Sequence, residues 1–378
     1  MYFVQTMETK VVKLDTANMD SAKITAAAQL VDSGGLVAFP TETVYGIASR
    51  VERTTLTRLD RLKGRDPEKN YTLHIAQKSD LQKYVPSVGL RARKLVDTAW
   101  PGPLTIVFEL SAADFDKQRT RLEAHVFESL YRNNSIGIRC PDHTVAAMLL
   151  QACKNPVVAP SANRTDAEPA VDAEGVLAQF SGEIDLVLDA GPSRYKKNST
   201  VAKIGKKGLQ ILRPGAYSQK DLEKSSQVKF LLVCTGNTCR SPMARGIFSK
   251  YLAEKLNCDI DQLGKMGYMI FSAGTLGMTG VSASTEAVKS CAAKGINIRP
   301  HKSEALTREL VEQCDFIFAM EQMHRDRVIA LDQHAAEKCV LLAESDIADP
   351  IGQPQQVYDD CAELIEKAVK KRISELVL

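Results

Sequence analysis

Short apolar runs alternate along this chain with longer stretches in which apolar residues recur every three or four positions. The short runs are bounded by Gly, Pro, Asp or Asn and are too short for helices, so they predict buried strands. The longer stretches predict amphipathic helices; Met243, Ile247 and Tyr251, for example, share one helical face. Predicted strands lie at residues 36–39, 104–110, 135–138, 157–159, 186–188, 209–212, 228–233, 268–272 and 316–319, and predicted helices at 22–31, 54–63, 242–256, 285–294, 322–331 and 358–376.

This alternation of strands and helices is typical of the α/β fold class. The 378 residues exceed what one hydrophobic core usually holds, so two domains are expected. The rhythm is interrupted at residues 218–227 (SQKDLEKSSQ), which are polar and lack apolar periodicity. We interpret this segment as the linker between a first domain at residues 1–217 and a second at 228–378. The alternative is that it forms the first helix of a packed junction.

Composition places the chain among ordinary globular proteins, with 44% apolar residues, 25% charged residues and a net charge of +3. No apolar run approaches the roughly 20 residues that span a bilayer, and no secretory signal precedes the first strand. The nine cysteines are odd in number and scattered, which favours a reducing compartment over a disulfide framework. We therefore expect a cytoplasmic protein that does not contact membranes. Translation starts at Met1 or at Met7.

The strongest chemical signal is the segment VKFLLVCTGNTCRS at residues 228–241. A predicted strand ends at Cys234, a short loop follows, and Arg240 and Ser241 open a helix, which gives a C-x5-R pattern. Successive main-chain N–H groups in such a loop form an anion site, and the helix N-terminus adds positive potential. Arg240 can bind two phosphate oxygens, and the same field favours the thiolate of Cys234. Ser241 can donate a hydrogen bond to the sulfur.

Two loop residues and one distant aspartate complete this interpretation. Gly236 lets the loop turn tightly, and Asn237 tolerates a left-handed backbone. A leaving group needs a proton, and Asp349 is the candidate donor because Pro350 restricts it to an extended backbone suited to a loop residue that reaches into a site. The competing interpretation of Asp349-Pro350 is a plain turn.

Residues 228–378 resemble the low-molecular-weight protein tyrosine phosphatase family in CTGNTCRS, in the following SPMARGIF, in Ser272-Ala273-Gly274-Thr275 and in Asp349-Pro350. The resemblance implies Cys234 as the nucleophile, Arg240 as the phosphate clamp and Asp349 as the general acid. It also implies a small parallel four-stranded sheet flanked by helices. The implied phosphate loop consists of Thr235, Gly236, Asn237, Thr238, Cys239 and Ser241.

Two residues bear on the type of phosphorylated residue that this domain would act on in its protein substrates. Thr238 stands where tyrosine phosphatases of the family usually carry a bulky aliphatic residue, and a threonine there resembles the protein-arginine phosphatase branch. Ile351 follows Asp349-Pro350, at a position where an aromatic residue would be able to stack on a phenol ring and isoleucine is not. Both favour phosphoarginine, with phosphotyrosine as the alternative. In the family, a neighbour such as Cys239 can form a reversible disulfide with the nucleophile; otherwise Cys239 is a small buried loop residue.

The first half carries no single motif of this strength, but several short polar clusters occur at the ends of predicted strands, where α/β sheets build their sites. They supply the cations of Lys63, Arg65 and Arg213 together with hydroxyl and amide groups. This inventory suits a triphosphate and a small polar acid, although no Walker-type loop is present. The clusters are residues 40–46 (PTETVYG), 63–65 (KGR), 101–105 (PGPLT), 139–143 (RCPDH), 161–163 (SAN), 199–201 (STV) and 212–215 (LRPG).

This ordered set resembles the YrdC-like family of threonylcarbamoyl-adenylate synthases over about residues 15–217. The resemblance implies an open twisted α/β sheet and the condensation of L-threonine, bicarbonate and ATP, with a magnesium ion bridging the phosphates and no prosthetic group or protein-held metal. It implies a product used by a separate transferase that modifies adenosine in tRNA. The implied ATP-binding residues are Lys63, Arg65, Thr105, Ser161, Asn163 and Arg213, and the implied threonine-binding residues are Thr41, Thr43, His74, Arg139 and Ser199.

Three departures from the family pattern bear on substrate affinity. Asp66 follows K-x-R where proline is usual, Asn70-Tyr71 replaces a common Pro-Leu or Gly-Leu, and residues 195–197 (YKK) precede Ser199 where smaller residues are usual. The alternative function for this half is a module that binds RNA or a nucleotide without catalysis. The sequence therefore predicts two enzymes in one chain, with the non-catalytic module as the rival for the first.

Overall fold

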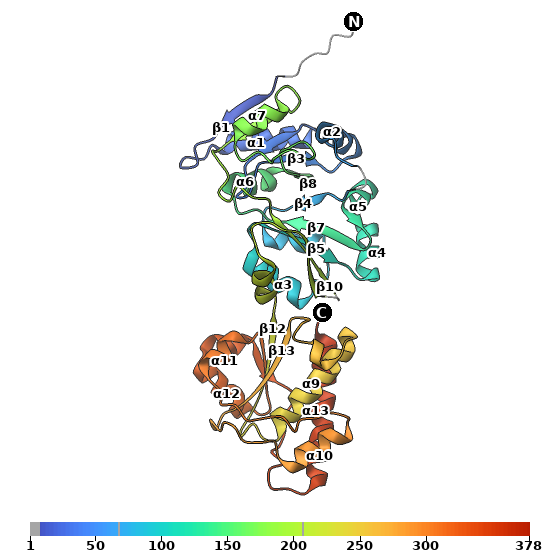
Figure 1. The fold of residues 1–378 in the computed structure, drawn as a ribbon, viewed down its shortest axis with the longest axis vertical. Coiled ribbons are helices and arrows are strands. Elements are labelled where there is room, and N and C mark those ends of the chain that lie inside the picture. Colours follow the sequence, from blue (N-terminus) through green and yellow to red (C-terminus); the bar gives the residue numbers. More distant parts are fainter. Residues whose placement is uncertain (1–7, 67–68, 206–207) are drawn as a thin grey trace. The chain divides into compact units, whose positions relative to one another are not determined.

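The structure is a computed structural model that describes residues 8–66, 69–205 and 208–378. The alternative start at Met7 lies outside the described residues. The chain divides into two compact units, one up to Ser225 and one from Ser226 to Leu378. Figure 1 shows the ribbon with its elements labelled. Within the described residues, no helix is both long and apolar enough to cross a membrane.

The first unit is built on one large mixed sheet, in agreement with the predicted α/β class. β6 (Tyr131–Arg132) pairs with β7 at the side of the main strand path. In spatial order, that path is β1 (Lys10–Lys13), β9 (Leu186–Asp189), β2 (Val37–Phe39), β3 (Gly46–Arg50), β8 (Val157–Val158), β4 (Thr72–His74), β7 (Ser135–Arg139), β5 (Leu104–Glu109), β10 (Thr200–Gly205) and β11 (Gly208–Arg213).

Helices surround this sheet, and their starts follow ordinary capping chemistry. The Asp20 side chain accepts from the first N–H groups of α1, and Ser111 and Asp172 cap α4 and α7 in the same way. Gly64 ends α2 in the left-handed conformation, as expected for a C-terminal glycine. The helices are α1 (Ser21–Asp32), α2 (Arg53–Lys63), the 3₁₀ helix η1 (Lys78–Lys83), α3 (Leu90–Ala99), α4 (Ala112–Arg121), α5 (Ala124–Leu130), α6 (Thr144–Ala152), α7 (Ala173–Phe180) and α8 (Gln219–Ser225).

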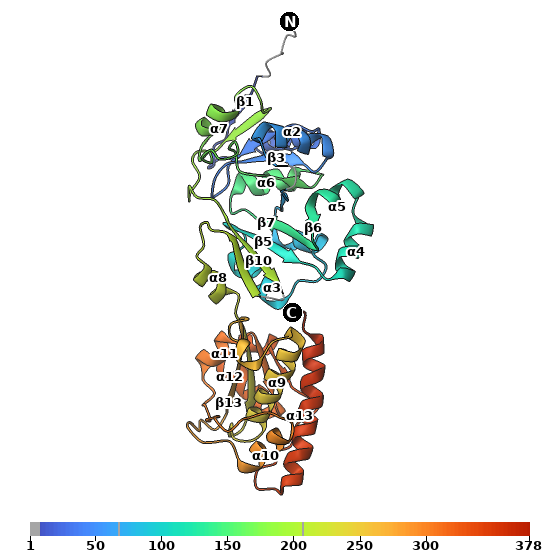
Figure 2. The same ribbon diagram turned by 45° about the vertical axis from the view of Figure 1, so that its right-hand side comes forward.

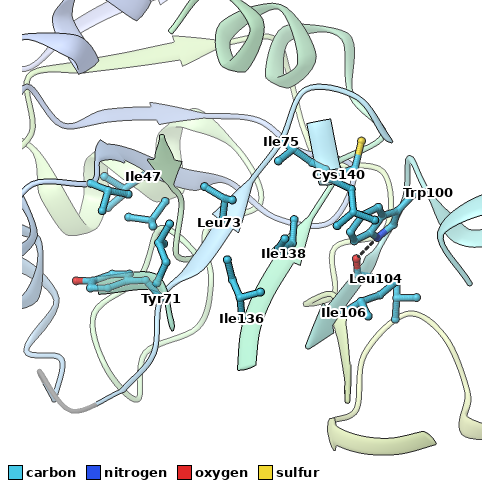
Figure 3. Close-up of a cluster of buried hydrophobic side chains, with 14 of the residues drawn as sticks. Ile47, Tyr71, Leu73, Ile75, Trp100, Leu104, Ile106, Ile136, Ile138 and Cys140 are labelled. Atoms are coloured by element: carbon cyan, nitrogen blue, oxygen red, sulfur yellow. Dashed lines mark hydrogen bonds between the residues drawn. The ribbon is translucent and has the colours of Figure 1, made fainter. Parts of the chain in front are cut away.

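The sheet buries both faces, which explains why its strands are short continuous apolar runs. In β2, Val37 and Phe39 join the core formed with α1 and α6, whereas Ala38 between them joins the core on the other side. Figure 3 shows part of that second core, where Leu73 of β4 and Ile138 of β7 lie among other apolar side chains. The indole of Trp100 donates a 2.7 Å hydrogen bond to the carbonyl oxygen of Leu104, so its polar atom is satisfied.

The polar segment at residues 218–227 differs from a simple linker. Most of it folds as α8, and Ser218 accepts from the main-chain N–H of Asp221 at its start. Leu222 is 1% exposed and belongs to the core of the first unit. A single apolar residue in a polar heptamer gives no periodic signal, so the sequence pattern does not reveal this helix.

The second unit contains a four-stranded parallel sheet in the order β13 (Tyr268–Gly274), β12 (Val228–Cys234), β14 (Phe316–Ala319) and β15 (Cys339–Leu341). The sheet type is the one that the family resemblance implies. The helices are α9 (Arg240–Leu256), η2 (Ile260–Gln262), α10 (Thr285–Ala293), α11 (Arg308–Gln313), α12 (Gln322–Leu331), η3 (Gln333–Glu337) and α13 (Gln355–Glu375).

The central strand β12 is apolar on both faces because helices cover both sides of this sheet. Phe230 packs against Phe248 of α9, with ring centroids 4.8 Å apart. The alternate residues Leu231 and Val233 join a core with α11 and α12. Figure 2 shows α13 alongside α9 on the face opposite α11 and α12. β12 therefore carries Cys234 to the carboxyl edge of the sheet, where α9 begins.

Candidate active sites

The first unit contains a cavity of about 770 Å³ at the ends of several strands. All the residues that the sequence predicts to bind ATP or threonine line it, with the exception of Thr43. Thr43 is fully buried beside it and supports two lining residues. Segments from residue 41 to residue 213 therefore meet around one space, although they are dispersed along the sequence.

The lining of this cavity is strongly cationic. Its five cations are Lys63, Arg65, Lys69, Arg139 and Arg213, and no carboxylate lines it among the residues the structure describes. Lys69 is a residue that the sequence reasoning missed, because it lies outside the K-x-R motif. This balance of charge fits an anionic ligand such as a polyphosphate.

Lys63 is held at the end of α2 by the chain segment that contains Ser161 and Asn163. Its ammonium group donates to the carbonyl oxygen of Ser161 at 2.5 Å and to that of Asn163. Ser161 in turn donates to the Asn163 side chain at 2.6 Å. Burial, together with the charge of Arg65, lowers the pKa of Lys63 to about 8.

Arg65 is fixed by a cluster that includes one of the family departures. Its guanidinium carbon lies 4.1 Å from the ring centroid of Tyr71, and one of its nitrogens lies 3.5 Å from the Asp60 carboxylate. The hydroxyl group of Tyr71 donates to the same carboxylate. Arg65 also donates to the Asn70 carbonyl oxygen at 2.8 Å. Tyr71 is thus a platform for the arginine of the K-x-R motif.

Arg139 forms a buried ion pair that the sequence analysis did not foresee. Its guanidinium donates to Glu42 at 2.9 Å and to the hydroxyl of Thr43 at 2.7 Å, with Thr41 at 3.4 Å. Glu42 is 1% exposed and also accepts from the main-chain N–H of Asp142 at 3.1 Å. The two threonines of the motif therefore support Arg139 through their hydroxyl groups, and Glu42 compensates its charge.

His74 and Ser199 contribute two further polar groups to the cavity wall. Burial and the charge of Arg139 lower the pKa of His74 to about 3, so the imidazole is neutral at physiological pH. Ser199 shares a 3.1 Å hydrogen bond with Thr105 and accepts from Arg213 at 3.0 Å. These contacts join the predicted nucleotide side and the predicted threonine side of the cavity.

In the second unit, the loop after β12 wraps around the sulfur of Cys234. The Ser241 hydroxyl lies 2.9 Å from this sulfur, and the main-chain N–H of Asn237 donates to it at 3.3 Å. Asn237 has a φ of 54°, the left-handed backbone expected from its residue type. Its side chain donates to Ser241 and accepts from the main-chain N–H of Glu304, so it ties the loop to the rest of the unit.

Several main-chain N–H groups of this loop are free to bind an anion. Those of Gly236, Thr238 and Cys239 have no hydrogen-bond acceptor among the described residues. The loop leads directly into the N-terminus of α9, a 17-residue helix that begins at Arg240. Free amides and a helix N-terminus together are the arrangement that binds phosphate in proteins.

Arg240 is 1% exposed and connects this loop to the predicted general acid. One terminal nitrogen donates to Thr235 at 2.9 Å and to Asp349 at 2.5 Å. The other donates to the Ile347 carbonyl oxygen at 2.7 Å and lies 3.0 Å from Glu321. A phosphate ion that binds Arg240 through the first nitrogen has to replace Thr235 or Asp349 there. Glu321 was not predicted, because it lies far away in the sequence at the start of α12.

The acid–base state of Cys234 differs from the sequence-based expectation. Burial raises the pKa of its thiol, since Cys234 is only 2% exposed. Hydrogen bonds from Ser241 and Asn237 and the charge of Arg240 act in the opposite direction. The loop thus contains the groups that favour a thiolate, but burial outweighs them in this state of the site.

Cys239 lies close to hydroxyl groups. Its sulfur is 3.4 Å from the Ser284 hydroxyl, 3.5 Å from the Tyr358 hydroxyl and 3.7 Å from that of Thr238. All nine cysteines fall within the described residues, and each is a free thiol.

Fold and sites together define an α/β protein with a cationic cavity in the first unit and a loop around a buried cysteine in the second. Residues 29–215 match the family model Sua5_yciO_yrdC, described as "Telomere recombination". Residues 229–377 match that of "Low molecular weight phosphotyrosine protein phosphatase". The chain belongs to the Sua5/YrdC family of threonylcarbamoyl-AMP synthases, in a form in which this domain is fused to a low-molecular-weight phosphatase domain.

Individual relatives match the first unit. A threonylcarbamoyl-AMP synthase from Pyrococcus abyssi (strain GE5 / Orsay) is 32% identical over 203 residues, which are 53% of this chain and 56% of that protein. This chain thus spans about half the length of that relative. A Mycobacterium tuberculosis (strain CDC 1551 / Oshkosh) protein assigned to the same synthase activity is 30% identical over 200 residues, 52% of this chain and 86% of its own length.

Among solved structures, Pyrococcus abyssi Sua5 complexed with L-threonine has the same fold. It aligns with 96% of this chain and 98% of its own length at 20% identity, with a TM-score of 0.51.

Proposed function

We propose that the first unit synthesises threonylcarbamoyl-AMP from L-threonine, bicarbonate and ATP and releases pyrophosphate. The observation that carries this proposal is the single cationic cavity around which the predicted residues lie together. The family name implies a synthase activity. Its substrates ATP and L-threonine need a site for a polyphosphate and a site for a small polar acid. The product would serve a separate transferase that modifies adenosine in tRNA.

In this proposal the enzyme acts by positioning and electrostatics. The threonine amine attacks the carbon of bicarbonate and water leaves, which gives the carbamate. A carbamate oxygen then attacks the α-phosphorus of ATP while the bond to pyrophosphate breaks. Lys63, Arg65 and Arg213 offset the charge that develops on the pyrophosphate. Arg139 binds a carboxylate or carbamate. The neutral His74 can accept or donate a hydrogen bond there.

Magnesium would enter with the nucleotide. The described residues contain no cluster of three or more His, Cys, Asp or Glu side chains that could hold a metal. The cavity offers hydroxyl and amide oxygens, such as those of Ser161 and Asn163, but no carboxylate among its described lining residues. Ser161 and Asn163 are the residues that could hold the ion, which would offset part of the charge of the phosphates.

The test for the first unit is pyrophosphate release from ATP with threonine and bicarbonate supplied together or singly. The proposal expects release only when both are present, and expects Lys63→Ala to lower it by about 100-fold, because a charged hydrogen bond to the leaving group is lost. Lys83→Ala is the control, since Lys83 lies outside the cavity and pairs with Asp80. Nucleotide or RNA binding without threonine-dependent release would favour the non-catalytic module instead.

We propose that the second unit is a protein phosphatase that works through a phosphocysteine. The observation that carries this proposal is the loop between β12 and α9, in which the Asn237 amide and the Ser241 hydroxyl contact the Cys234 sulfur and Arg240 begins the helix. The thiolate attacks phosphorus, the bond to the leaving group breaks, and Asp349 gives the leaving group a proton. Asp349 then takes a proton from water, which attacks phosphorus and releases the Cys234 thiolate. Ser241 stabilises that thiolate.

We favour phosphoarginine over phosphotyrosine as the substrate. Thr238 is half-buried in the loop and offers a hydroxyl group where an aliphatic side chain would narrow the entrance. Ile351, which follows the Asp349-Pro350 pair, is 63% exposed and offers no aromatic face for a phenol ring. A flexible, cationic leaving group does not need such a face.

The test for specificity is hydrolysis of phosphoarginine and phosphotyrosine peptides by the same preparation, with Cys234→Ser as the inactive control. Wild type should prefer phosphoarginine, and Thr238→Ile should shift the preference towards phosphotyrosine by about tenfold, the size expected for one hydrogen bond or methyl contact. An unchanged preference in Thr238→Ile removes the support for the arginine assignment.

We also propose that the protein functions in the cytoplasm, where thiols stay reduced. The nine free cysteines, one of them the proposed nucleophile, support this compartment.

A further inference from the structure

A histidine that has no part in the mechanism above lies directly behind the phosphate loop. His324 is in the first turn of α12 and is 0% exposed. Its Nε2 atom is 2.8 Å from the hydroxyl oxygen of Thr235, and its Nδ1 atom has no hydrogen-bond partner among the described residues. Thr235 is the first loop residue after Cys234, so the ring contacts the loop without reaching the substrate site itself.

The chemistry of the atoms fixes the direction of the bond from Arg240 and allows the Thr235 hydroxyl to donate to His324. A guanidinium group can only donate, so the Thr235 oxygen accepts the 2.9 Å bond from Arg240. The hydrogen of the Thr235 hydroxyl is then free for a further acceptor, and Nε2 of His324 is within reach. When that hydroxyl donates to Nε2, Nε2 is the unprotonated nitrogen and His324 is a neutral ring with its proton on Nδ1.

We infer that His324 is a positioning residue for the phosphatase reaction: its unprotonated Nε2 orients the Thr235 hydroxyl, and this hydroxyl holds the guanidinium of Arg240 in place for phosphate. This inference rests on the proposed phosphatase function of the second unit. It assigns a role to a residue that lies 89 positions from Thr235 in the sequence.

The positioning of Arg240 by Thr235 and His324 matters most when the substrate binds. The nitrogen of Arg240 that bonds Thr235 also bonds Asp349. Phosphate that binds this nitrogen in place of Asp349 frees the carboxyl group to act as the acid. Thr235 is then the remaining protein partner of that nitrogen. A fixed Thr235 hydroxyl keeps the guanidinium from turning when its bond to Asp349 is lost.

Protonation of His324 would reverse the direction of its hydrogen bond with Thr235. Nε2 would become a donor to Thr235, and a second cation would lie beside Arg240. The charged groups that face the ring are Arg240 from α9, Glu321 at the start of α12, and Asp346 and Asp349 from the segment after β15; the carboxylates favour the cation and Arg240 opposes it. Burial and Arg240 lower the pKa of His324, so the ring loses its neutral form only on the acid side.

The test is a double-mutant cycle in the full chain, measured as phosphatase kcat/KM. His324→Leu and Thr235→Val should each lose about tenfold, and the double variant should lose the same tenfold, because both remove one shared relay. His324→Gln should recover most of the activity, since its amide oxygen can accept from Thr235. His324→Gln should also lack the fall in kcat/KM at acidic pH that protonation of His324 causes in the wild type.

Three results would overturn the inference: wild-type kcat/KM in both single variants, additive losses in the double variant, or no recovery in His324→Gln while its melting temperature stays at the wild-type value. Thr235→Val keeps the test decisive if His324→Leu fails to fold, because Thr235 is half-buried in a loop.

A second readout does not depend on catalysis. The ¹⁵N NMR shifts of the His324 ring in the full chain should show Nδ1 protonated and Nε2 unprotonated at neutral pH. The reverse tautomer or a doubly protonated ring contradicts the inference. A wild-type protein that hydrolyses no phosphoamino acid but shows the expected ring would instead contradict the proposed phosphatase function and leave the relay geometry intact.

Discussion

Burial changes the acid–base behaviour of the same side chains that the motifs single out. Lys63 is buried against two carbonyl oxygens and beside Arg65, so its pKa falls to about 8. Cys234 is buried beneath its loop, so its pKa rises even though hydrogen bonds and Arg240 favour the thiolate. For Lys63, a phosphate ligand is the group that would complete the site electrostatically.

For Lys63 this leads to a pH-dependent affinity for ATP. The lysine is cationic below its pKa of about 8 and neutral above it, and the phosphates of ATP favour the cation, so binding raises this pKa. We expect the affinity for ATP to fall as pH rises through about 8, and binding at pH 8 to take up about half a proton.

Calorimetry in two buffers of different ionisation enthalpy measures this uptake, and Lys63→Met is the variant that should abolish it. Equal proton uptake by wild type and Lys63→Met would assign the titration to another group.

Tyr71 is the second residue-scale prediction. Replacing it by Leu, the residue common in the family, removes both the ring under Arg65 and the hydroxyl bonded to Asp60. We expect KM for ATP to rise about fivefold in Tyr71→Leu, and by less in Tyr71→Phe, which keeps the ring.

Steady-state pyrophosphate release measures both values. Tyr131→Phe is the matched control, because Tyr131 is a buried tyrosine whose hydroxyl donates to the Tyr84 carbonyl oxygen outside the cavity. A lower KM in Tyr71→Leu would mean that Tyr71 obstructs the nucleotide.

Motif residues could be predicted from the sequence because their types and spacing carry the chemistry. Their supporting partners could not. Glu42 lies within the motif at residues 40–46, but nothing in that motif indicates a partner for its carboxylate. Only the fold shows that it pairs with Arg139. Glu321 and His324 are both remote in sequence from the phosphate loop that they support. No local pattern marks such pairs, since each depends on strands and helices that meet at the sheet edge.

At the scale of elements, the residues of both sites lie mostly at the ends of strands. The elements that the sequence predicts best are those with a buried, apolar pattern. β14 and α12 have the bounds predicted from their apolar patterns. β3 (Gly46–Arg50) was not predicted, because a serine and an arginine interrupt its apolar pattern. Ser49 is nevertheless fully buried, and Arg50 donates to the Asp32 carbonyl oxygen at the end of α1.

The end of β13 approaches the phosphate loop so closely that only glycine fits. A Cβ atom on Gly274 would lie 2.8 Å from the Thr235 carbonyl oxygen and 3.0 Å from the main-chain nitrogen of Asn237. These are backbone atoms of the loop and cannot rotate away. We expect Gly274→Ala to deform the loop, to cost about 1–3 kcal/mol of stability, and to lower phosphatase kcat/KM by at least about tenfold.

Gly264→Ala is the control, because its Cβ would meet only the Met269 sulfur at 3.8 Å. Chemical denaturation and phosphatase assays on the two variants measure the difference. Full activity in Gly274→Ala would mean that the loop does not need the geometry described here.

At the scale of the whole molecule, the two units have separate cores and separate sites. The cationic cavity draws its described lining from residues 41 to 213, and the phosphate-loop site is built from residues after 233. The two proposed reactions share no substrate: one consumes ATP and an amino acid, the other a phosphorylated protein. Each site should therefore work when the other is inactivated chemically.

The most direct measurement of this account compares both activities in the same preparations of full-length wild type, Lys63→Ala and Cys234→Ser. Threonine- and bicarbonate-dependent pyrophosphate release should fall by about 100-fold only in Lys63→Ala, and phosphate release from phosphoarginine or phosphotyrosine peptides should disappear only in Cys234→Ser. A wild-type protein that lacks either activity, or a single variant that loses both, would contradict the assignment of two independent active sites to this chain.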